Sequence, residues 1–124
     1  MSYTGIVLVS HSTKVAEGIK EIIREVTKEV PIEAAGGTDE NEIGTSVEKI
    51  EQAIRQADAG NGVLVFYDIG SAKMNVEMIL ETIEDVDARL MEAPLLEGSY
   101  VAAVESSMEK NVDDISQAIN KSFG

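Results

Sequence analysis

The sequence contains no cysteine and no tryptophan, and basic residues are scarce. Without cysteine the chain forms no disulfide and offers no thiolate ligand to a metal, which fits a reducing compartment. The 23 acidic side chains outnumber the 10 basic ones and give a formal net charge of −13. This charge repels phosphate backbones and anionic headgroups, so nucleic acids and membranes are poor candidates for partners.

Long apolar segments are also missing. The longest apolar runs are far shorter than a membrane span, and the N-terminus has neither a basic region nor a cleavable apolar one. The length of 124 residues is that of one ordinary domain, large enough to bury a core. We therefore expect a cytoplasmic protein with a single domain over residues 1–124.

Short apolar runs alternate with stretches of helical periodicity along the whole chain. Strands are predicted at 5–9, 31–35, 62–67 and 86–92. Helices are predicted over about 12–29, from 45 to about 57, after 71, over 100–108 and from 111. Ser12, Thr45 and Asn111 have the side chains of helix N-caps, and Thr45 and Glu48 have the spacing of a capping box.

The first of these helices has its apolar residues at helical spacing. We expect it to bury one face, which consists of Val15, Ile19, Ile22, Ile23 and Val26.

The alternation of strands and helices favours an α/β fold with a parallel sheet and helices on both faces. The runs "IVLV" and "VLVF" are uninterrupted and apolar, as in strands that are buried on both faces. The other two strands carry Pro31, Glu33, Asp87 and Arg89, which suit the edges of a sheet. The predicted order of the four strands is therefore 2-1-3-4, which opens a crevice at the carboxyl ends of the first and third strands.

His11, the only histidine, follows the first strand and so enters this crevice. Asp68 and Ser71 follow the third strand and should lie beside it. Two helices are predicted to begin there, and their free N–H groups and dipoles favour an anion. The chain also supplies hydroxyl groups that suit a phosphate, at Ser10, Ser12, Thr38, Thr45, Ser46 and Ser71.

Each of these residues also has a simpler interpretation. A lone histidine is often an ordinary surface or hydrogen-bonded residue, although the position of His11 at a strand end in a crevice favours a functional role. Asp68 has the residue type of a helix cap or an Asx turn, and Thr45 that of a helix cap. The adjacent Gly36 and Gly37 are typical of a tight turn.

The available side chains restrict the chemistry. A zinc site lacks nitrogen and sulfur ligands, and no G-x-S-x-G nucleophile elbow precedes a helix. The shortage of aromatics disfavours a stacked flavin, which leaves a mononucleotide-binding module as the non-covalent alternative. Phosphoryl transfer through His11 fits the residues, because a carboxylate such as Asp68 would fix the imidazole tautomer and make the ring more nucleophilic. Such a carrier needs neither a metal nor a cofactor.

Three motifs in register, "GIVLVSHSTKVAEGI", "AGGTDENEIGTS" and "DIGSAKMN", are followed by "EAPLLEGSYVAAV". Together they resemble the mannose-type enzyme IIA family, in its branch of phosphotransferase subunits of phosphoenolpyruvate-dependent dihydroxyacetone kinases. The resemblance covers essentially the whole chain. The compact "DIGSA" favours this branch over sugar-transporter members, which typically carry a tryptophan or an extra glycine before the serine.

The resemblance implies a function. His11 would be phosphorylated by the carrier protein HPr, a separate protein, and would pass its phosphoryl group to ADP held in the nucleotide-binding subunit of the kinase. The rebuilt ATP then phosphorylates dihydroxyacetone, in the metabolism of glycerol. A homodimer is expected from the family and from the apolar segment "APLLEGSYVAAV". The alternatives are an enzyme IIA of a mannose-type sugar transporter, a mononucleotide-binding module and a regulatory domain.

Overall fold

The computed structural model describes residues 3–124 and has a four-stranded parallel sheet at its centre. The strand order is β2-β1-β3-β4, which confirms the predicted 2-1-3-4 order and the α/β class. The strands are β1 (Gly5–Ser10), β2 (Ile32–Gly36), β3 (Val63–Tyr67) and β4 (Ala88–Leu90). The central strands β1 and β3 are almost wholly buried, as their uninterrupted apolar sequences predict.

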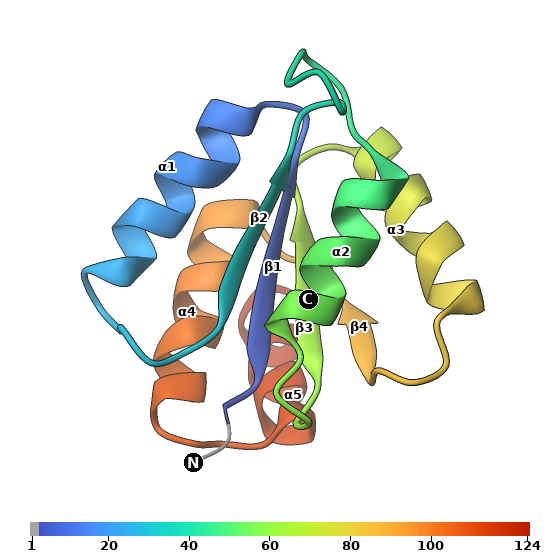
Figure 1. The fold of residues 1–124 in the computed structure, drawn as a ribbon. Helices are drawn as coiled ribbons and strands as arrows, with labels where there is room; N and C mark the ends of the chain where they lie inside the picture. The colour runs from blue at the N-terminus through green and yellow to red at the C-terminus, as the bar shows by residue number, and fades with distance from the viewer. Residues whose placement is uncertain (1–2) are drawn as a thin grey trace.

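Helices cover both faces of the sheet (Figure 1). They are α1 (Thr13–Arg24), α2 (Val47–Ala57), α3 (Gly70–Thr82), α4 (Leu95–Ser107) and α5 (Val112–Phe123). One face packs against α1, α4 and α5, and the other against α2 and α3. Side chains alternate along β1, so that Ile6 and Leu8 enter the first core while Val7 and Val9 enter the second. In residues 3–124 no helix is long and apolar enough to cross a membrane.

The first helix differs from the prediction in its length and in its buried face. It ends at Arg24 instead of continuing to residue 29, because the chain tightens into a turn in which the N–H groups of Glu25 and Val26 bond three residues back. The Arg24 side chain then donates to the Val30 carbonyl at 2.6 Å and ties this turn to the start of β2.

The buried face of α1 consists of Ala16, Ile19 and Ile23. The expectation that Val15, Ile22 and Val26 are also buried is wrong, since all three are exposed by more than 40%. Val15 and Ile22 lie on the neighbouring stripe of the helix, of which the sheet covers only one stripe, and Val26 lies in the turn after the helix ends.

The cap of α2 lies one residue later than predicted. Ser46, and not Thr45, is the N-cap, because its hydroxyl accepts the Lys49 N–H at 3.2 Å. Thr45 instead accepts a hydrogen bond from the Asn75 amide on α3. The predicted caps Ser12 and Asn111 are confirmed, with bonds from the N–H groups of Val15 and Asp114.

The segment "APLLEGSYVAAV" forms most of α4, which begins earlier than predicted. Its small residues Gly98, Ala102 and Ala103 are buried within the chain, and this burial accounts for much of its apolar character. Leu96 and Tyr100 are the only large apolar side chains that remain exposed on this helix. The homodimer therefore stays a prediction.

Two glycines provide a matched test of the packing. A Cβ at Gly5 would overlap the carbonyl oxygen of Ala57, whereas one at Gly18 in α1 would meet nothing within 4 Å. We expect Gly5→Ala to destabilise the fold by about 1–3 kcal/mol through overpacking. Gly18→Ala should stabilise it by about 0.5–1 kcal/mol through helix propensity. Urea denaturation measures both, and changes of the same sign would contradict this packing.

Candidate functional site

His11 and Asp68 come from neighbouring central strands and meet at the carboxyl edge of the sheet. His11 directly follows β1, Asp68 directly follows β3, and the two strands are paired in parallel. The loop between β2 and α2 rises over this edge, at the top of Figure 1. Residues that lie 57 positions apart in sequence are thus brought into contact, as the predicted strand order requires.

The Asp68 carboxylate accepts four hydrogen bonds. Its Oδ2 receives the Ser10 hydroxyl and the His11 backbone N–H, both at 2.9 Å. Its Oδ1 receives the Ile69 N–H at 2.7 Å and lies 3.0 Å from Nδ1 of the His11 ring. This carboxylate therefore fixes the backbone and the side chain of His11 at the same time.

These contacts keep Asp68 ionised. Partial burial by itself would raise the pKa of Asp68. The hydrogen bonds from the His11 backbone, the His11 ring, Ile69 and Ser10 outweigh burial, so the pKa of Asp68 lies below its ordinary value of 3.8. An ionised carboxylate is only an acceptor, and Nδ1 of a neutral His11 must therefore carry the proton.

The other ring nitrogen of His11 faces the start of α3. Nε2 lies 2.6 Å from the Ser71 hydroxyl, which donates to it when Nδ1 carries the proton. The N-cap residue of α3, Ile69, makes no side-chain capping bond, so no side chain caps the first turn of this helix, which carries Ser71. The His11 side chain is 20% exposed, which leaves the ring accessible from outside. The arrangement is a nucleophilic nitrogen beside a site suited to an anion.

The structure brings Ser10, His11, Asp68 and Ser71 together, as the sequence predicts. Ser10 is fully buried, and its oxygen also accepts the Ser12 N–H at 3.0 Å.

The remaining predicted hydroxyl groups have structural partners. The Ser12 and Ser46 hydroxyls cap helices, and Ser46 also donates to Asp39. The Thr38 hydroxyl accepts the Glu42 N–H at 3.1 Å within its own loop. Thr45 is bonded to Asn75. All four hydroxyl groups are therefore less available to a phosphate than that of Ser71. Their role in phosphate binding stays a prediction.

Sequence reasoning missed the contacts that support His11 from the side of β2. The Gly44 N–H donates to the His11 carbonyl at 2.9 Å. Lys49 holds the loop that carries Gly44 through a hydrogen bond to the Asn41 side chain in that loop. The motif "AGGTDENEIGTS", which carries part of the family resemblance, contains this loop, but Lys49 lies outside the motif. Within residues 3–124 no group of three His, Cys, Asp or Glu side chains is arranged to hold a metal ion.

Comparisons with known proteins match the whole fold. The family model described as PTS system fructose IIA component (EIIA-man) matches residues 5–116. A Listeria innocua protein, PEP-dependent dihydroxyacetone kinase 1, phosphoryl donor subunit DhaM, is 42% identical over 90% of this chain and 88% of its own. The Lactococcus lactis PTS-dependent dihydroxyacetone kinase, phosphotransferase subunit DhaM, is 39% identical over 98% of this chain and 96% of its own.

Two crystal structures share the fold. A protein of unknown function has a TM-score of 0.86 at 31% identity and covers 98% of this chain and 95% of its own. A sigma-54 interaction domain protein from Enterococcus faecalis has a TM-score of 0.69 at 20% identity, over 98% of this chain and 90% of its own, and it shows the fold alone.

The lowered pKa of Asp68 predicts how this site contributes to stability. In the unfolded chain the carboxyl titrates near 3.8, so its contribution is fully present above that pH and is lost as the pH falls through the lower folded-state value. Asp68→Asn should therefore lower the free energy of unfolding at neutral pH, and its difference from the wild type should shrink as the pH falls below 3.8. Chemical denaturation across this range measures the difference. A difference that stays constant with pH would contradict a role for the charge.

Proposed function

The chain belongs to the EIIA-man family of PTS system fructose IIA components, which confirms the resemblance in its motifs, and from this membership we propose that it is a histidine phosphocarrier. Specifically, we propose the phosphoryl donor subunit of a phosphoenolpyruvate-dependent dihydroxyacetone kinase, the description that its relatives at 39% and 42% identity carry. The observation that supports the proposal most is the 3.0 Å contact between Asp68 and Nδ1, which leaves Nε2 as the nucleophile.

The donor in this proposal is phospho-HPr, and the acceptor is ADP bound in the nucleotide-binding subunit of the kinase. In the first step the lone pair of Nε2 forms a bond to phosphorus while the bond from phosphorus to the donor protein breaks. In the second step a terminal phosphate oxygen of ADP forms a bond to the same phosphorus. The bond to Nε2 then breaks, its electron pair returns to the ring, and the product is ATP.

Asp68 has two tasks in this scheme. It holds the proton on Nδ1, so the lone pair of the neutral ring is on Nε2. During transfer the ring becomes positively charged, and the adjacent carboxylate stabilises that charge. Because Asp68 also binds the His11 N–H, the ring and the backbone are oriented by one group.

The start of α3 receives the phosphoryl group. Ser71 lies 2.6 Å from Nε2, so its hydroxyl turns from donating to the ring to donating to a phosphoryl oxygen. Backbone N–H groups of the first turn and the helix dipole add to the stabilisation of negative charge. This arrangement uses no metal or cofactor of the chain itself, since transfer depends on positioning and charge stabilisation.

Exposed apolar side chains lie close in sequence to the residues that contact His11, and they suit the docking of a partner protein. Ile43 is 78% exposed and directly precedes Gly44, which binds the His11 carbonyl. Ile69 follows Asp68, and Met74, 66% exposed, lies one turn after Ser71 on the same side of α3. We propose that both partners dock here in turn. Since this chain is strongly acidic, each partner presents to it a surface with an apolar centre and a basic rim.

Phosphorylation tests the proposed function directly. Incubated with phosphoenolpyruvate, enzyme I and HPr, the chain should gain a single phosphoryl group that is labile to acid and stable to base, because a phosphoramidate has these properties and a serine ester does not. His11→Gln should abolish the reaction. Asp68→Asn should slow it by about ten- to a thousandfold, because the tautomer is no longer fixed by a charge.

The acceptor is tested with the labelled protein. The ADP-loaded kinase subunit should discharge it and free ADP should not, because the docked partner supplies the in-line geometry. Removal of the label only by an enzyme IIB domain of a sugar transporter would show that the acceptor is wrong. Absence of any label in the first experiment would overturn the carrier and favour a mononucleotide-binding module.

Met74 allows docking to be separated from chemistry. Met74→Glu should lower the second-order rate of loading by phospho-HPr by about tenfold or more, since it places a charge in the apolar centre of the contact. Loading of His11 by phosphoramidate, a small donor, should not change. Met108→Glu is the matched control, because Met108 is also exposed and follows Ser106, which binds Thr4 at the opposite end of the sheet. Equal effects of the two substitutions would contradict the docking surface.

A further inference from the structure

The loop of residues 37–45, here called the covering loop, is hydrogen-bonded to two backbone carbonyl groups, those of Ser10 and His11, which lie on either side of the His11 Cα. The Gly37 N–H donates to the Ser10 carbonyl at 3.1 Å, and the Gly44 N–H donates to the His11 carbonyl at 2.9 Å. Since the His11 N–H is held by Asp68, the peptide groups before and after this residue are both fixed. The position of the ring therefore depends on the position of this loop.

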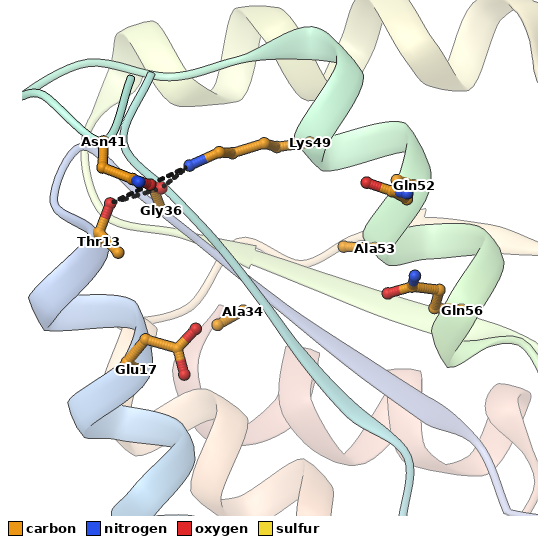
Figure 2. Close-up of a pocket in the computed structure, with 9 residues that line it drawn as sticks. All are labelled: Thr13, Glu17, Ala34, Gly36, Asn41, Lys49, Gln52, Ala53 and Gln56. Carbon is orange, nitrogen blue, oxygen red and sulfur yellow. Dashed lines mark hydrogen bonds between the residues drawn. The ribbon is translucent and has the colours of Figure 1, made fainter. Parts of the chain in front are cut away.

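The covering loop is folded on itself around Thr38 and Asn41. Thr38 donates its N–H to the Glu42 carbonyl and accepts the Asn41 N–H, both at 2.9 Å. Asn41 has a φ of 62°, in the left-handed region that asparagine tolerates better than most residues. This turn directs the Asn41 side chain toward Lys49 of α2 (Figure 2).

Lys49, in the first turn of α2, reaches across to this loop (Figure 2). Its Nζ donates to the Asn41 side-chain oxygen at 2.7 Å and to the Gly36 carbonyl, at the end of β2, at 3.1 Å. The Thr13 hydroxyl, from α1, donates to the same Gly36 carbonyl at 2.9 Å. These contacts close the upper end of a groove of about 230 Å³ between α1 and α2, above the open edge of β2.

The hydrogen-bond partners of Lys49 are neutral groups. Of the 23 acidic residues, none forms a salt bridge with Lys49 within residues 3–124. The Lys49 ammonium instead donates hydrogen bonds to two neutral oxygens, the Gly36 carbonyl and the Asn41 side-chain oxygen. Hydrogen bonds from a charged donor are stronger than those between neutral groups. The alternative role is protection of the open edge of β2, which a lysine also provides.

We propose that Lys49 is a positioning residue for phosphoryl transfer, which acts through Asn41 and the covering loop to hold the His11 carbonyl. The proposal rests on the proposed function, because it assigns Lys49 a part in the same reaction. Lys49 does not touch the reacting atoms. It fixes the loop, the Gly44 N–H fixes the His11 backbone, and the backbone sets the direction in which Nε2 meets phosphorus.

The test uses two substitutions that remove the same contact from opposite sides. Lys49→Met keeps the length of the side chain without the charge, and Asn41→Gly removes the side-chain oxygen while it tolerates the positive φ. Lys28→Met is the matched control, because it makes the same change in charge at an exposed position before β2, at the opposite end of the sheet. Amide hydrogen exchange at Gly44 and at Leu8, in the buried β1, is measured for each protein.

We expect exchange at Gly44 to accelerate about tenfold in Lys49→Met and in Asn41→Gly, with little change at Leu8 and none in the control. At saturating phospho-HPr the rate of loading should fall about tenfold in both variants, with less than a twofold change in KM. The double variant should be no slower than the slower single variant, because the two residues act through one contact.

A merely structural role gives different results. Equal acceleration at Gly44 and Leu8, or faster exchange at Gly44 with an unchanged rate of loading, would overturn the proposal. A slower rate without a change at Gly44 would also overturn it, because the effect would not pass through the loop. If the unaltered chain accepts no phosphoryl group, the proposed function fails, and the exchange rates still decide whether Lys49 holds the loop.

Discussion

The four hydrogen bonds on the Asp68 carboxylate are the interaction on which the site depends. They join the end of β1 to the end of β3, and they come from two backbone N–H groups, one hydroxyl and one imidazole nitrogen. Because these donors stabilise the ionised form, the carboxylate remains an acceptor and dictates which nitrogen of His11 carries the proton. The parallel pairing of β1 with β3 makes this contact possible, since it places both strand ends at one edge.

Charge is distributed unevenly between the site and the rest of the molecule. The chain has a formal net charge of −13, yet Nε2 contacts the neutral Ser71 hydroxyl, and the segment that carries Ser71 includes the exposed apolar side chains Ile69 and Met74. In the proposed carrier, a phosphoryl group on Nε2 would meet the Ser71 hydroxyl at the start of α3, with Asp68 bonded to the other ring nitrogen. An acidic exterior favours partners with basic surfaces and speeds their approach, while the apolar residues at the centre provide affinity.

The strand order and the contact between His11 and Asp68 could be predicted from the sequence, because uninterrupted apolar strands are central and their carboxyl ends meet. The face of α1 could not, since Val15 and Ile22 lie only one stripe away from the buried residues and hydrophobicity does not tell them apart. Thr45 and Ser46 are both good caps, and only the tertiary contact of Thr45 with Asn75 separates their roles. Lys49 had no sequence signal, because its partners are a strand-edge carbonyl and a loop residue with positive φ.

The central claim is that Asp68 holds the proton on Nδ1 so that Nε2 of His11 carries the phosphoryl group. Nitrogen-15 NMR of the phosphorylated chain, with histidine labelled in both ring nitrogens, measures this through the coupling between phosphorus and nitrogen. The account predicts a one-bond coupling to Nε2 and a proton on Nδ1. A one-bond coupling to Nδ1, or a phosphoryl group on Ser71, would contradict it.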